Sequence, residues 1–134
     1  HDGVIWINSC VVGTWLGWEI LATATPPQVY DFPLTDGFSV WGVCSYFKTQ
    51  DGIVTVNVNI GSTPVTGAGN EAVIGNLPEG FRPTGHVIAA AYCNHGNDLN
   101  SKPGYIFVDY LGTVRMRGDA DWTYGHASVT FFAP

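Results

Sequence analysis

Charge is the scarcest property of this sequence of 134 residues. Asp, Glu, Lys and Arg make up 12% of it, whereas soluble domains usually contain about 25%. Only five residues are basic against eleven acidic ones, and the formal net charge is -6. Nucleic acids and anionic membrane surfaces are bound by basic faces. The sequence therefore predicts a protein with no nucleic-acid partner.

Long apolar runs and helical periodicity are also missing. No apolar run approaches the roughly 20 residues that a membrane-spanning helix needs, so no membrane insertion is predicted. Almost no stretch shows the 3.6-residue period of an amphipathic helix. The 17 glycines and 8 prolines divide the chain into short pieces, which favours strands and turns. The length suits one domain with its own core.

The motifs of metal, redox and hydrolytic chemistry are absent as well. Cys10, Cys44 and Cys93 each lie in an apolar stretch and form no Cys-x-x-Cys pair, so we expect buried, reduced thiols. The sequence contains no Gly-x-Ser-x-Gly, His-Glu-x-x-His or phosphate-binding loop,. We therefore expect a protein that is not an enzyme and that has no cofactor and no metal.

What the sequence does contain is a series of short strand patterns. In 53–60, Val54, Val56, Val58 and Ile60 alternate with polar residues, which is typical of a half-buried strand. The turn 49–52 (Thr-Gln-Asp-Gly) joins it to an aromatic-rich stretch as a hairpin,. Strands are predicted at 3–12, 14–24, 38–48, 53–60, 72–77, 86–93, 105–110, 113–117 and 126–133. The pattern predicts an all-β fold, an antiparallel barrel or sandwich of Greek-key or jelly-roll type.

The low charge content also bears on assembly. A soluble domain with so few charges is expected to bury part of its surface in a partner, and further copies of the same chain are the simplest partner. The alternative is a monomer whose surface is polar but uncharged, since the chain is rich in Asn, Thr and Gly.

The second half of the chain resembles a known family. Segment 77–83 reads Leu-Pro-Glu-Gly-Phe-Arg-Pro and precedes a strand; a Gly-aromatic strand at 104–108, a Leu-Gly-Thr-Val turn at 111–114, a loop with Trp122 and a terminal strand at 127–133 follow. This order resembles the C-terminal receptor-binding heads of bacteriophage tail and baseplate proteins, notably of phages that infect Gram-positive bacteria. The likeness extends over residues 14–134.

The resemblance implies a function and a setting. It implies a homotrimeric head that binds saccharides of the host cell wall, a polysaccharide or a teichoic-acid-like glycan, without turning them over. It places the protein in the virion, at the tail tip or baseplate, and joined to other tail proteins through a part that precedes His1. Residues 1–30 would be strands and a linker on the neck or shoulder side, and residues 31–134 the β-barrel head.

Saccharide recognition requires an aromatic face for the sugar ring and polar side chains for its hydroxyls. The last loop and its flanks supply all of these: Arg115, Arg117, Asp119, Asp121, Trp122, Tyr124 and His126. Asn94 and His95 begin a second polar loop and complete the candidate site. The alternative for Trp122 is a structural one, in which its ring anchors the loop in the core or at a subunit contact.

Three other interpretations of the whole chain remain open at this point. A purely structural tail-fibre or baseplate domain would use the same aromatic residues as trimer core. A small glycan-degrading enzyme would need a carboxylate pair, drawn from Asp109, Asp119 and Asp121. A trimeric jelly roll of the tumour-necrosis-factor or complement type has a similar number of strands. His86 lies in an apolar strand and is expected to be a core or interface residue.

Overall fold

The computed structural model describes residues 4–11, 14–23, 25–96 and 102–134. No helix in these ranges is long and apolar enough to cross a membrane. The regular elements are β1 (Val4–Val11), β2 (Thr14–Thr23), β3 (Val29–Asp31), β4 (Phe38–Val40), β5 (Ser45–Lys48), β6 (Ile53–Val65), the 3-10 turn η1 (Ala68–Asn70), β7 (Glu71–Asn76), β8 (Val87–Asn94), β9 (Lys102–Val108), β10 (Thr113–Gly118) and β11 (Trp122–Phe132).

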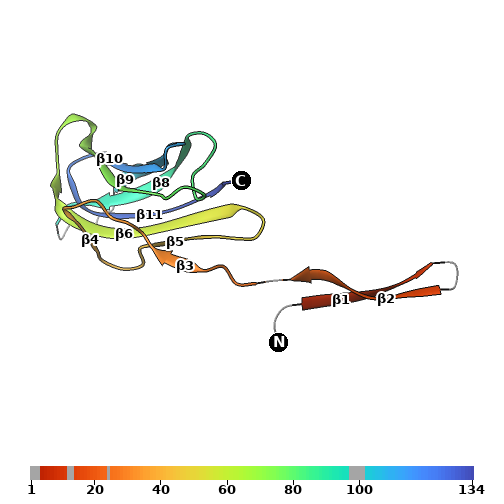
Figure 1. Ribbon diagram of the computed structural model, residues 1–134. Helices are drawn as coiled ribbons and strands as arrows, with labels where there is room; N and C mark the ends of the chain where they lie inside the picture. The colour runs from red at the N-terminus through yellow and green to blue at the C-terminus, as the bar shows by residue number, and fades with distance from the viewer. Residues whose placement is uncertain (1–3, 12–13, 24, 97–101) are drawn as a thin grey trace.

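The strands form two antiparallel sheets of very different size. β1 and β2 pair only with each other and form a hairpin that extends away from the rest of the chain (Figure 1). The other strands form one curved sheet in the order β3-β5-β6-β11-β8-β9-β10-β7, with β4 also paired to β6. The all-β antiparallel class is therefore confirmed, and the architecture is a half-barrel.

The two ends of the large sheet approach each other. Leu34, just after β3, forms an isolated bridge with Gly75 of β7. The amide of Thr35 donates a hydrogen bond to the carbonyl oxygen of Ile74 over 2.9 Å. This contact curls the sheet so that its concave side encloses the core, while its convex side remains available to solvent or to a partner.

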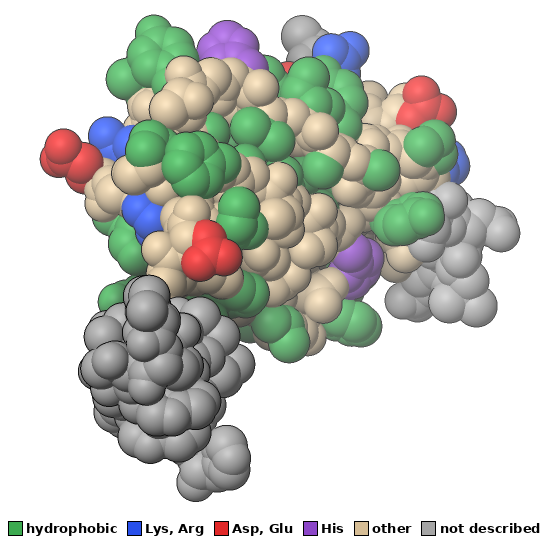
Figure 2. All heavy atoms as spheres, turned by 90° about the vertical axis from the view of Figure 1, so that its right-hand side faces the viewer, with side chains coloured by type: hydrophobic (Ala, Val, Ile, Leu, Met, Phe, Trp, Pro, Cys, Tyr) green, Lys and Arg blue, Asp and Glu red, His purple; other side chains and the backbone are tan. Residues whose placement is uncertain are grey.

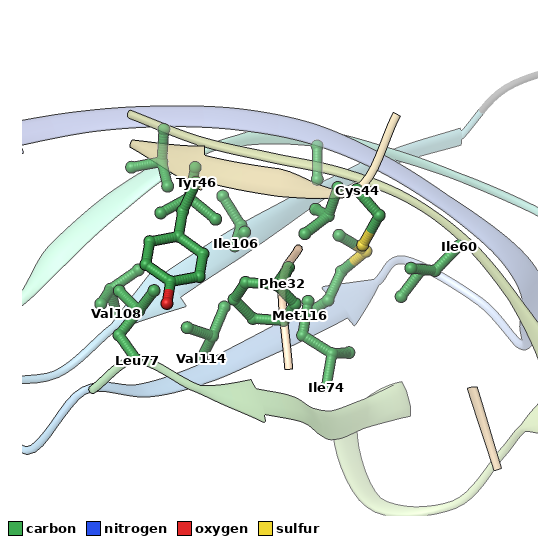
Figure 3. Close-up of a cluster of buried hydrophobic side chains, with 14 of the residues drawn as sticks. Phe32, Cys44, Tyr46, Ile60, Ile74, Leu77, Ile106, Val108, Val114 and Met116 are labelled. Atoms are coloured by element: carbon green, nitrogen blue, oxygen red, sulfur yellow. The ribbon is translucent and has the colours of Figure 1, made fainter. Parts of the chain in front are cut away.

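The core occupies the concave side of the sheet. On β6 the predicted alternation is confirmed, because Val54, Val56, Val58 and Ile60 are all buried. Their partners across the core come chiefly from β7, β9 and β10, as Figure 3 shows for Ile74, Ile106, Val108, Val114 and Met116. Complete burial of one such aliphatic side chain stabilises a fold by about 1.5–3 kcal/mol. The cysteines Cys44 and Cys93 are buried and reduced, as expected.

The predicted strand at 38–48 is wrong, because the chain breaks there into β4 and β5. Both short strands pair with β6, and residues 41–44 lie between them. The backbone amides of Trp41 and Gly42 both donate to the carbonyl oxygen of Asn59, over 2.8 and 3.3 Å. Two donors that share one acceptor mark a local irregularity of the ladder, similar to a bulge.

The predicted loop at 118–125 is also too long. Strand β11 already begins at Trp122, which pairs with Val65 of β6, so the connection from β10 consists of residues 119–121. The predicted turns at 49–52 and 111–112 are confirmed. In the second of these turns the carboxylate of Asp109 accepts hydrogen bonds from the amides of Leu111 and Thr113, each over 3.0 Å.

Candidate functional site

The convex face of the sheet carries no charged residue on its three central strands. β6, β11 and β8 contain no Asp, Glu, Lys or Arg. The register places Asn59 opposite His126 and His126 opposite Tyr92, which makes a row of side chains across the face. Asn57 and Ser128 form the next pair along. Figure 2, which views the domain from one end of the sheet, shows that charged side chains are few and scattered there as well.

Trp41 is the most exposed large aromatic side chain near this row. Its side chain belongs to the break between β4 and β5, and the residue is 65% exposed. The indole lies against the ring of Tyr124, with 5.1 Å between centroids, and against the imidazole of His126 at 6.5 Å. A large aromatic ring that is held by two others yet open to solvent is suited to cover the apolar side of a ligand.

Asn59 holds this arrangement together. Its carbonyl oxygen accepts the amides of Trp41 and Gly42, and its side-chain oxygen forms a hydrogen bond with Nδ1 of His126. Gly42 leaves room for this side chain, because a Cβ atom at position 42 would lie 2.9 Å from the side-chain nitrogen of Asn59 and would displace it.

A hollow of about 470 Å³ adjoins this cluster on the convex face. Val43, Asn57, Asn59, His126 and Ser128 are among the residues that line it. Ser128 Oγ donates a hydrogen bond to the side-chain oxygen of Asn57 over 2.8 Å. We call the side chains of Trp41, Asn57, Asn59, Tyr124, His126 and Ser128 the Trp41 surface. It combines an exposed ring with uncharged hydrogen-bonding groups, which are the two requirements of a saccharide site.

Trp122 does not have the exposure that a sugar platform needs. The residue is 0% exposed and belongs to the core. Its indole NH donates a hydrogen bond to the carbonyl oxygen of Asn70 over 2.8 Å, and its ring packs beside Phe38. A ring with no free face cannot stack on a ligand, so the prediction of an exposed Trp122 is wrong and the alternative of a core anchor holds.

The structure separates the other predicted residues. Tyr124 and His126 belong to the Trp41 surface, whereas Arg117 and Asp119 line a second hollow near β9 and β10. Arg115 lies 3.4 Å from the carboxylate of Asp109 and 3.9 Å from that of Glu71. Asp121 follows the end of β10 that bears Arg117, and it is exposed. Asn94 pairs with Tyr124 across β8 and β11, and the exposed His95 follows it. The predicted set therefore does not form one cluster.

Two further expectations concern Asp109 and His86. Asp109 is buried in the turn before β10, while Asp119 and Asp121 follow β10, so strand β10 separates Asp109 from the other two carboxylates. His86 is exposed and stacks on Tyr110 with 5.9 Å between ring centroids, so the expectation of a core histidine is wrong. Within the described ranges no three His, Cys, Asp or Glu side chains are grouped so that they could hold a metal ion.

The sequence pattern did not identify Trp41 or Asn59 as site residues. Trp41 lay inside a stretch read as continuous strand, and Asn59 counted only as one of the polar residues that alternate along β6. The available signal was Gly42, a glycine directly after a tryptophan within an aromatic-rich strand pattern, since an isolated glycine in such a pattern indicates a bulge or a close backbone approach.

The fold is that of a solved phage protein domain. It is similar to the crystal structure of the head domain of phage bIL170, with a TM-score of 0.65 and 11% identity. The description of that structure asks whether the receptor binding domains of lactococcal phages share a common fold. The match covers 81% of this chain and 100% of that domain. The resemblance predicted from the sequence is thus confirmed at the level of the fold. No protein-family model and no curated protein matches the sequence.

Proposed function

We propose that this chain is the host-adhesion domain of a phage tail protein and that it binds cell-wall saccharides at the Trp41 surface. The observation that carries the proposal is the position of Trp41, exposed and held against Tyr124 and His126 beside an uncharged hollow. The ring would cover the C–H side of a sugar, while Asn57, Asn59 and Ser128 exchange hydrogen bonds with its hydroxyls. Binding of this kind involves no turnover, so the domain acts as an adhesin and not as an enzyme.

The fold supports the adhesion part of the proposal. A domain that shares this fold comes from a lactococcal phage and is described as receptor-binding. By analogy, residues 31–134 would be the head at the tail tip or baseplate, and residues 1–30 would connect it to other tail proteins. The expected receptor is a cell-wall polysaccharide or a teichoic-acid-like glycan of a Gram-positive host.

We further propose that the head is a homotrimer. Beside the Trp41 surface the uncharged convex face continues onto β8, where Ile88 and Tyr92 are exposed at 63% and 60% and offer the contact between copies. Exposed apolar side chains of this size are typical of contact surfaces. A face without charges allows copies with a net charge of -6 to meet without burying like charges against one another,.

The test compares two exposed aromatic residues at opposite ends of the half-barrel. Trp41→Ala removes the proposed platform, and Tyr110→Ala removes a ring of similar exposure, 57%, that lies in the turn between β9 and β10. Purified protein is incubated with lactococcal and other Gram-positive cell walls, and the bound fraction is measured against protein concentration. An aromatic platform is worth about 1–3 kcal/mol, by analogy with base stacking, so Trp41→Ala should weaken binding roughly 10-fold or more.

Two controls make the result decisive. Light scattering after size exclusion should give a mass three times the 14.4 kDa of one chain, for the wild type and for both variants. Long incubation with walls should release no sugar. Equal binding by Trp41→Ala and the wild type would contradict the Trp41 surface, whereas a trimer that binds no wall at all would favour a purely structural tail domain.

A further inference from the structure

A second hollow, of about 540 Å³, lies beside β9 and β10, away from the Trp41 surface. Arg117, Tyr105, Asn70 and Asp119 line it together with several glycines. Strands β9 and β8 separate Arg117 on β10 from the Trp41 surface on β11. The second hollow therefore differs from the first in position. It also differs in chemistry, because Arg117 and Asp119 line it, whereas no Asp, Glu, Lys or Arg is among the described residues that line the first.

Arg117 is held in place but is not neutralised. Its guanidinium donates a hydrogen bond to the hydroxyl of Tyr105 over 3.2 Å and lies 5.9 Å from the centre of that ring. Among the described residues Arg117 forms no ion pair: Glu71, its partner across β7 and β10, places its carboxylate 3.9 Å from Arg115 instead. Two arginines on the same strand thus differ sharply: one is paired with acidic groups and the other faces a hollow.

The wall of the hollow beside Arg117 is an unusual piece of backbone. Asn70 adopts a φ of 48°, in the left-handed region that few non-glycine residues occupy, and Gly69 precedes it with a φ of 74°. The hydrogen bond from the buried indole of Trp122 to the carbonyl oxygen of Asn70 fixes this conformation. Unfavourable backbone conformations of this kind cluster at ligand sites.

Gly69 allows the guanidinium to lie close against the wall. A Cβ atom at position 69 would be 3.0 Å from Cζ of Arg117 and 3.2 Å from its Nε. The loop, the ring of Tyr105 and the guanidinium are therefore fitted to one another without a ligand, so little side-chain freedom remains to be lost when a ligand binds.

We infer that this hollow is a second binding site, and that it takes the anionic group, a carboxylate or a phosphate, of an acidic saccharide. A guanidinium without a carboxylate partner offers paired NH groups that match either anion. Asp119 on the same rim can accept hydrogen bonds from the hydroxyl groups of the sugar ring,. The inference rests on the proposed function only in taking a saccharide as the ligand.

The experiment uses three small probes on the whole 15N-labelled chain: glucose, glucuronate and glucose 6-phosphate. The amides of Gly69, Gly104 and Gly118 report on the hollow, which they line. We expect both acidic probes, or one of them, to shift these amides, and glucose to leave them unchanged. The acidic probe with the lower dissociation constant identifies the anion as carboxylate or phosphate.

Two arginine variants provide the matched comparison. Arg117→Gln should weaken binding of the acidic probe at least 10-fold, while Arg115→Gln should retain it within a factor of two. The spectrum of Arg117→Gln must overlay that of the wild type away from the hollow, which shows that the variant folds. If it does not, Arg117→Lys replaces it. Lysine keeps the positive charge but lacks the paired NH donors of the guanidinium, so this variant should weaken binding as well.

Several results would overturn the inference: equal shifts with glucose, shifts centred outside the hollow, or undiminished binding by both Arg117 variants. Trp41→Ala separates this inference from the proposed function. It should reduce wall binding while leaving the shifts of Gly104 and Gly118 by the acidic probe unchanged. If the wild-type protein binds no walls but its hollow binds the acidic probe, the proposed function fails and the second site stands.

Discussion

Replacing Trp122 with Ala should destabilise the domain strongly. The residue is fully buried, and its indole NH holds the carbonyl oxygen of Asn70. Truncation of a buried aromatic residue to Ala costs about 3–5 kcal/mol, and a lost hydrogen bond to a buried carbonyl adds roughly 1 kcal/mol. A destabilisation of about 4 kcal/mol corresponds to a decrease in Tm on the order of 15 °C for a domain of this size.

The assay is thermal unfolding followed by circular dichroism, supported by urea titration to obtain the free energy of unfolding. Trp41→Ala is the matched control, because it removes the same side chain from an exposed position. That variant should change the free energy of unfolding by no more than about 1 kcal/mol. The two variants should therefore have different effects: Trp122→Ala lowers the stability of the domain, and Trp41→Ala weakens its binding to cell walls.

A variant Trp122→Ala with a Tm close to that of the wild type would refute the reasoning, since burial and the bond to Asn70 would then contribute nothing. Loss of wall binding by a stable Trp122→Ala variant would point in the same direction, because it would mean that the ring meets the ligand directly. Trp122→Phe should fall between the wild type and Ala, because it retains most of the buried area and loses the NH donor.

Two further outcomes test the packing around β9. Gly104→Ala should destabilise the domain by about 1–3 kcal/mol, because its Cβ would lie 2.3 Å from the carbonyl oxygen of Arg117. Gly85→Ala should be neutral, because no atom lies within 4 Å of the added Cβ. Equal Tm values for the two variants would contradict this packing. Burial raises the pKa of the Cys93 thiol to about 11 from an ordinary 9.0. Because the folded state holds the proton more tightly, the stability that comes from the neutral thiol is complete below about pH 9 and is lost as the pH rises through 11. With about 1.4 kcal/mol per pKa unit, the loss is on the order of 2–3 kcal/mol. Urea titrations between pH 8 and 11 should show this decline in the wild type and a smaller one in Cys93→Ala; parallel declines would exclude the thiol as its source.

The sequence was sufficient to predict most of the sheet. The alternation along β6 and the Gly-containing turn before it depend on neighbours in the chain, so their pattern identified both the strand and its buried side,. The breaks at 41–44 and the early start of β11 at Trp122 were not predictable in this way. Each depends on a partner distant in sequence, since Asn59 accepts the two amides of the break and Val65 pairs with Trp122.

The candidate site was predicted less well than the fold, for a related reason. Residue type selected Tyr124 and His126, which the structure places together in the Trp41 surface. Whether a tryptophan is buried or exposed depends on the sheet that surrounds it, so composition alone could not distinguish Trp41 from Trp122. Likewise, only the structure distinguishes Arg115, which has acidic partners, from Arg117, which faces the second hollow.

The break between β4 and β5 presents side chains that can vary without disturbing the fold. Trp41, Gly42 and Val43 are exposed, and the backbone of the break is attached to β6 through the carbonyl oxygen of Asn59, which no substitution removes. Of residues 41–44, only Cys44 contributes its side chain to the core. Substitutions at positions 41 and 43 therefore change the chemistry of the Trp41 surface and its hollow at little cost in stability. Under the proposed function, variation at these two positions would alter which cell walls the domain binds, while the half-barrel stays the same.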